Sequence, residues 1–179
     1  MNIFKLSLMT LLVFTIFSCS TDAINPDTEN SLIANPDLLG TWTGIDVSYT
    51  GSVTTTTDGT TTVQDIEGNN FDGTYTITFT QDPNVITGEG LYSITEETTI
   101  PGGDTSSRII TNLNLVTSFT NWNLVDSELT MTADNKIITA TISELTSNSL
   151  IMLINENTTT TINGVSETLV KNSVFTYTR

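Results

Sequence analysis

The side chains that carry out most enzyme chemistry are nearly absent from this sequence. Its 179 residues contain no histidine and a single cysteine, Cys19. Without histidine the chain cannot form a Ser-His-Asp triad, a Cys-His dyad or a zinc site that uses imidazole. A single cysteine also excludes an intramolecular disulfide and a thiolate zinc cluster. Carboxylates are the remaining candidates for chemistry.

Twenty Asp and Glu residues could supply pairs for acid–base catalysis, but their spacing does not favour it. Glu96 and Glu97 are adjacent, so on a strand their side chains point to opposite faces. Asp126 and Glu128 share a face but flank a turn, where solvated charge is usual. The run Glu67–Asp72 offers oxygen atoms for Ca²⁺ without the spacing of a defined calcium loop. We therefore expect no enzyme, no metal and no cofactor.

The charge balance limits the partners of the protein. Lys and Arg total 5 against 20 Asp and Glu, which gives a formal net charge of −15. Affinity for nucleic acid comes from Lys and Arg that neutralise phosphates, so we expect no nucleic-acid partner. An acidic domain also gains nothing from anionic lipid headgroups. Attachment to a membrane would need a lipid.

The lone cysteine lies at the end of an N-terminal targeting signal. Lys5 precedes the apolar run Leu6–Phe17, which has the length of a signal-peptide core and is too short for a transmembrane helix. Ile16-Phe17-Ser18-Cys19 resembles the lipobox of bacterial lipoproteins, although Phe17 replaces the usual small residue. In that family the chain is cut before the cysteine, which carries the lipid. The alternative is an ordinary cleaved signal with an incidental cysteine.

This resemblance implies a division of the chain into three parts. Residues 1–18 are a lipoprotein signal peptide, and residues 19–37 are a flexible tether that begins at the lipidated Cys19. Turn signals at Asn25-Pro26-Asp27 and Asn35-Pro36-Asp37 are typical of such a tether. Residues 38–179 then form one domain of the bacterial cell envelope. The lipid holds that domain to a membrane, expected to be the outer membrane, in the periplasm or at the cell surface.

The sequence of residues 38–179 predicts β-strands and no helices. In Phe71–Thr80 apolar side chains alternate with polar ones, most of them threonine, which is typical of a half-buried strand. Asp58-Gly59 and Asn163-Gly164 are two-residue hairpin signals, and Asp134-Asn135 is a further turn signal. We expect about nine strands, of which two could be one bulged strand or one could be short. Their expected ranges are 40–57, 60–67, 71–81, 85–100, 105–119, 122–133, 136–146, 149–162 and 165–178.

The short connections favour an all-β, antiparallel up-and-down β-barrel of about eight to ten strands over a Greek-key sandwich, which needs long crossovers. A transmembrane barrel is not expected, because its outward face would need a continuous apolar band. Here that face is mostly threonine. With an even number of strands, the first and last strands would be antiparallel neighbours.

Three segments resemble lipocalins. Leu39-Gly40-Thr41-Trp42 resembles their Gly-x-Trp strand, and residues 122–131 and 142–153 resemble the second half of bacterial lipocalin-like lipoproteins. The resemblance implies a lipocalin-like barrel, and in lipocalins proper the barrel mouth takes small apolar ligands. It also implies that Trp42 closes one end of the barrel beneath a basic side chain from the last strand. Arg179 is the expected partner.

Large side chains on the expected strands could either line a ligand pocket or fill the core. These candidates are Trp42, Tyr75, Phe79, Tyr92, Trp122 and Met131. Eight-stranded barrels are often just wide enough for their own side chains, so we favour a filled core. Ligand binding would require a pocket of several hundred Å³.

Two hypotheses of function follow. In the first, a lipid-anchored, non-enzymatic barrel of the envelope binds a small apolar or amphipathic ligand. In the second, an interaction module with a filled core binds a protein or a glycan through its loops or its outer face. An apolar interior that is empty and open at one end would favour the first.

Overall fold

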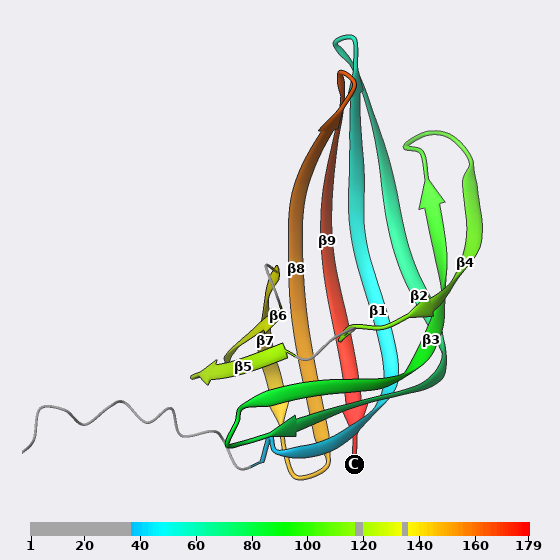
Figure 1. Ribbon diagram of the computed structural model, residues 1–179. Helices are drawn as coiled ribbons and strands as arrows, with labels where there is room; N and C mark the ends of the chain where they lie inside the picture. The colour runs from blue at the N-terminus through cyan, green and yellow to red at the C-terminus, as the bar shows by residue number, and fades with distance from the viewer. Residues whose placement is uncertain (1–36, 117–119, 134–135) are drawn as a thin grey trace, which may run out of the picture. The chain divides into compact units, whose positions relative to one another are not determined.

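A computed structural model describes residues 37–116, 120–133 and 136–179, all of which belong to one compact unit. The predicted signal peptide, Cys19, the tether up to residue 36 and the turn at Asp134-Asn135 lie outside the described residues. The described part contains nine strands (Figure 1) and no helix long and apolar enough to cross a membrane. The strands are β1 (Gly40–Thr57), β2 (Thr60–Thr80), β3 (Val85–Thr99), β4 (Thr105–Leu113), β5 (Thr120–Val125), β6 (Glu128–Ala133), β7 (Lys136–Leu145), β8 (Ser149–Ile162) and β9 (Val165–Thr178).

The nine strands form one antiparallel sheet whose hydrogen bonds close into a ring. The order is β2-β1-β9-β8-β7-β6-β5-β3, and pairing of β2 with β3 closes it. Strands consecutive in sequence are neighbours except β4 and β5, which both pair with β3. The predicted all-β fold and antiparallel neighbour-to-neighbour connectivity are therefore confirmed. The first strand pairs with the last, as predicted for an even number, because eight strands form the ring and β4 lies outside it. The architecture is barrel-like.

Three of the predicted ranges differ from the observed strands. The ranges 60–67 and 71–81 form a single strand, β2, which is the alternative of one bulged strand, because the apparent turn between them is an irregularity opposite β3, with Asn70 at φ 56°. Conversely, the range 122–133 is divided into β5 and β6 by a turn at Asp126, where φ is 54°. The range 105–119 ends as a strand at Leu113. Both hairpin signals are confirmed, since Asp58-Gly59 and Asn163-Gly164 have positive φ at both positions.

The ring closes over only part of the length of its strands. β7 pairs with β8 as far as Ile154, and beyond it residues 155–162 of β8 pair with β9 alone among the described strands. β4 likewise pairs only with β3. In this half the sheet is six strands wide, in the order β8-β9-β1-β2-β3-β4, and β8 and β4 are its edges among the strands that the structure describes (Figure 1). We call this part of the sheet the trough.

The core fills the half in which the ring is closed. Alternating residues of β1, β2 and β9 face inward there, and the largest side chains are fully buried. They include Trp42, Tyr75, Phe79, Leu129, Met131, Leu150, Met152 and Tyr177. Burying such side chains contributes about 1.5–3 kcal/mol each. The closed half therefore contains most of the buried core, and the strands of the trough extend from it.

Trp42 and Arg179 join the two ends of the domain. The guanidinium carbon of Arg179 lies 3.9 Å from the ring centroid of Trp42, so the contact predicted from the sequence is present. Arg179 also donates to the backbone carbonyls of Asp37 and Leu39, and Trp42 Nε1 donates to the carbonyl of Leu38 at 2.9 Å. A cation over an indole contributes about 0.5–2 kcal/mol. These contacts fix the start of β1 beside the end of β9.

Candidate binding cavity

The structure has two adjoining cavities, one within the trough and one between the trough and β7. The first, of about 460 Å³, is lined by inward-facing residues of β1, β2, β3, β4 and β9. The second, of about 510 Å³, lies between β7, β8, β9 and the segment that follows β4. The two cavities share five lining residues: Tyr92, Leu113, Lys171, Ser173 and Phe175. Volumes of this size are typical of pockets for small ligands.

Only one of the six large side chains proposed from the sequence reaches a cavity. Tyr92 lines both cavities, whereas the other five pack in the core and are at most 3% exposed. Those five are Trp42, Tyr75, Phe79, Trp122 and Met131. The core is filled where the sequence analysis placed the pocket candidates, and the open volume lies further along the same strands.

A polar row crosses the first cavity because of the strand register. Tyr49 of β1 pairs with Gly68 of β2, Gly68 pairs with Glu96 of β3, and Glu96 pairs with Arg108 of β4. On the other side Tyr49 pairs with Ser173 of β9. Residues paired in this way across neighbouring strands share a face of the sheet. The five positions come from five strands. Four of them carry polar side chains that form a band in the wall of the cavity, and Gly68 leaves a gap in that band.

Gly68 provides the gap that lets Tyr49 reach Glu96. A Cβ atom at Gly68 would lie 2.3 Å from Cε1 of Tyr49, so the phenol ring occupies the space above the glycine. The Tyr49 hydroxyl donates a hydrogen bond to Oε2 of Glu96. Any side chain at this position would displace the ring and separate the phenol from the carboxylate.

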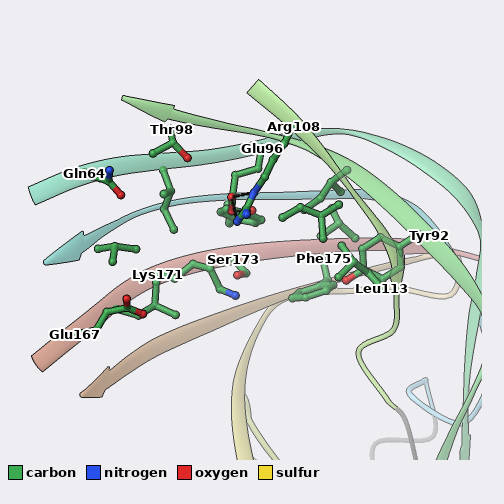
Figure 2. A pocket seen from close by; sticks show the side chains of 17 residues that line it. Gln64, Tyr92, Glu96, Thr98, Arg108, Leu113, Glu167, Lys171, Ser173 and Phe175 are labelled. Atoms are coloured by element: carbon green, nitrogen blue, oxygen red, sulfur yellow. Dashed lines mark hydrogen bonds and ion pairs between the residues drawn. The ribbon is translucent and has the colours of Figure 1, made fainter. Parts of the chain in front are cut away.

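Glu96 is a buried carboxylate with partners on both oxygens. It is 6% exposed, and its Oε1 accepts from Arg108 Nε at 2.8 Å and lies 2.5 Å from Arg108 Nη2. Figure 2 shows Glu96 and Arg108 meeting at the cavity, with Lys171 and Ser173 coming from β9. Burial of a charge is tolerated when it is paired and hydrogen-bonded. The Tyr49–Glu96–Arg108 cluster meets both conditions.

The phenols of Tyr49 and Tyr92 at the cavity have raised pKa values. Burial raises the pKa of Tyr49 above its usual range, and the hydrogen bond to Glu96 and the charge of Glu96 raise that pKa further. Burial also raises the pKa of Tyr92 to about 12. Glu97 is exposed, so it does not form an acid–base pair with the buried Glu96. Among the described residues, no three acidic side chains gather as ligands for a metal.

Basic side chains gather at these cavities. Lys171 lines both of them, with Nζ 2.5 Å from Oε2 of Glu156 and 5.3 Å from the ring centroid of Tyr49. Arg108 lines the first cavity and Lys136 lines the second. Three of the five basic residues of the chain are therefore cavity residues. Of the other two, Arg179 covers Trp42, and Lys5 lies outside the described residues.

The sequence analysis missed Tyr49, Arg108 and Lys171, and it considered Glu96 only as a catalytic acid. The sequence of β9 contains a signal that could have indicated a polar cavity. Lys171 and Ser173 share the inward face of that strand with Phe175, so polar residues stand where the alternation predicts apolar ones. Polar side chains on the core face of a strand indicate an interior that is not completely filled.

Comparison with known proteins adds no relative. No protein-family model matches the chain, and no curated protein or solved structure matches it either. The function is therefore argued from the cavities and from the residues that line them.

Proposed function

We propose that this protein is a lipid-anchored, non-enzymatic, lipocalin-like barrel of the bacterial cell envelope that binds a small amphipathic ligand in its two adjoining cavities. The supporting observation is the open interior, about 460 and 510 Å³ in two parts that share lining residues. A module that bound partners only through its outer face would have no need of such an interior, because protein cores otherwise pack to high density.

The distribution of polarity along the cavities favours an amphipathic ligand over a purely apolar one. Toward the core the first cavity is lined by Val47, Ile94 and Phe175. Beyond them Lys171 and the polar row form a band of charged and polar groups, and Val53 and Leu169 line the cavity on the far side of that band. An elongated ligand would place its apolar part against the core and its polar part among the charged side chains. Matching polarity in this way avoids leaving buried polar groups without partners.

Native mass spectrometry of the full-length protein from its own host tests this function. We expect a small molecule to remain bound, and to be lost when the cavity is filled by Leu169→Trp, since Leu169 lines the first cavity. The matched control is Val170→Trp, because Val170 is 39% exposed on the opposite face of the same strand. Far-ultraviolet circular dichroism verifies that both variants fold. The proposal would be contradicted if the protein bound no co-purified molecule and no added amphiphile.

A further inference from the structure

We propose that the ligand of these cavities is an anionic amphiphile, a single acyl or alkyl chain with a carboxylate or a similar acidic head, whose head is held by Lys171 and Lys136. This inference rests on the proposed function, to which it adds the chemical class of the ligand and the residues that select it.

The placement of charge is the first argument. In a chain of net charge −15, basic residues are scarce, yet three of the five line the two cavities. The lining of the second cavity contains Lys136 and Lys171 against the single carboxylate of Glu156. The second cavity is therefore locally positive in an acidic protein, whereas in the first cavity Arg108 and Lys171 are matched by Glu96 and Glu167. A local excess of one charge favours a ligand group of the opposite sign.

The position of Lys171 is the second argument. Its side chain is 26% exposed and belongs to the lining that the two cavities share, which also contains Phe175 and Tyr92. An ammonium has three donors, so contact with Glu156 leaves Lys171 further donors for a ligand. The Tyr49 ring at 5.3 Å limits where the ammonium can lie. Lys171 can thus bind an acidic head while the adjacent apolar wall receives the chain.

Lys136 supplies a second cation at the rim of the same cavity. It is exposed at the start of β7, and it forms no ion pair with any residue that the structure describes. A ligand that covered these two ammonium groups with a neutral head would remove their hydration without replacing it. An acidic head replaces the lost hydration with charge-assisted hydrogen bonds.

The buried carboxylate does not favour a cationic ligand. Both oxygens of Glu96 are already occupied, one by the Tyr49 hydroxyl and the other by Arg108. A cationic head would have to displace the Arg108 guanidinium or the Tyr49 phenol to reach Glu96. Glu156 is likewise held by Lys171. In the second cavity the remaining charge among the lining residues is that of the ammonium groups, whereas the carboxylate of Glu167 lines only the first cavity.

Three probes with the same alkyl chain test the inference: decanoate, decanol and decyltrimethylammonium. We would titrate each at neutral pH, by calorimetry, into the full-length protein in phosphatidylcholine nanodiscs, with empty nanodiscs as the reference. We expect decanoate to bind tightest. Lys171→Met and Lys136→Met, which keep the apolar stem, should each weaken decanoate about fivefold and leave decanol unchanged.

The control variant is Ser147→Asp, which changes the net charge by the same amount at an exposed turn between β7 and β8. It should leave the affinity for decanoate unchanged. Equal affinities for all three probes, or tightest binding of the cation, would overturn the inference while leaving the proposed function standing. Failure of all three probes to bind would count against the proposed function itself.

Discussion

At the scale of single residues, the most consequential group is the carboxylate of Glu96. It is buried in the polar row of the first cavity, and the two partners differ in exposure, since the Arg108 side chain is 71% exposed and that of Glu96 is 8%. Removal of one partner of a buried pair leaves the other charge without compensation. Glu96 therefore depends on Arg108 and Tyr49, whereas Arg108 can be solvated without Glu96. Loss of Arg108 should therefore cost more stability than loss of the charge of Glu96, although the two residues make the same contact.

That asymmetry predicts different effects of the two single substitutions. Arg108→Met should destabilise the fold by about 1–3 kcal/mol, because the carboxylate of Glu96 is left with Tyr49 alone. Glu96→Gln should be milder, because an amide is easier to bury than a charge. In the double variant, Glu96→Gln should restore part of the stability lost with Arg108. Urea denaturation of the four proteins measures this cycle, and equal stability of Arg108→Met and the double variant would contradict it.

The tyrosines give a second prediction at this scale. All four tyrosines of the chain, namely Tyr49, Tyr75, Tyr92 and Tyr177, are less than 9% exposed. Burial raises the pKa of each above the ordinary value of 10, with that of Tyr92 at about 12. Above pH 10 the unfolded chain loses phenolic protons that the folded chain keeps. Proton release then favours unfolding, so stability falls as the pH rises.

The limiting slope of that loss is about 1.4 kcal/mol per pH unit for each tyrosine whose proton the fold retains. Spectrophotometric titration at the phenolate absorption band measures it directly. We expect no phenolate in the folded protein between pH 10 and the onset of unfolding, followed by ionisation of all tyrosines together. Ionisation of even one tyrosine with an ordinary pKa before unfolding would show that its phenol is exposed to solvent.

At the scale of strands, the sequence predicts the fold well where local signals and tertiary pairing agree. The hairpin at Asn163-Gly164 is an example, because positive φ at both positions is a property of the two residues themselves. The segment around Asn70 has the same kind of signal, yet it bends β2 without ending it. Pairing with β3 continues on both sides of the bend. Whether a cluster of polar residues ends a strand or only bends it depends on whether the neighbouring strand continues to pair on both sides.

The candidate site shows the same limit. Alternation in β9 places Lys171 and Ser173 on the inward face, and that much can be predicted from the sequence. The meeting of Tyr49 with Glu96 cannot, because it depends on the pairings of Tyr49 with Gly68 and of Gly68 with Glu96. A shift of one residue in either register would turn the carboxylate to the opposite face. Register between distant strands is a property of the assembled sheet.

At the scale of the whole molecule, the closed half of the sheet and the trough have different roles. The closed half holds the buried core, and contact of Arg179 with Trp42 joins the first strand to the last. The trough carries the cavities and ends in hairpins rich in threonine, such as the one formed by residues 54–62. Threonine suits both a strand and exposure to water. A stable base and a hydrophilic open end are properties expected of a domain that takes up a ligand from water.

The charge of the whole molecule makes the proposed anchor testable. A chain of net charge −15 is repelled by anionic membrane surfaces, so retention on a membrane would depend on the lipid on Cys19. Cys19→Ser should abolish incorporation of labelled palmitate and move the protein to the soluble fraction. The control Ser20→Ala should keep both the label and the membrane location. Labelled palmitate that persists in Cys19→Ser would show that Cys19 is not the site of lipidation. If the wild-type protein were never labelled, the signal would be an ordinary one, and the cavities would then belong to a secreted protein.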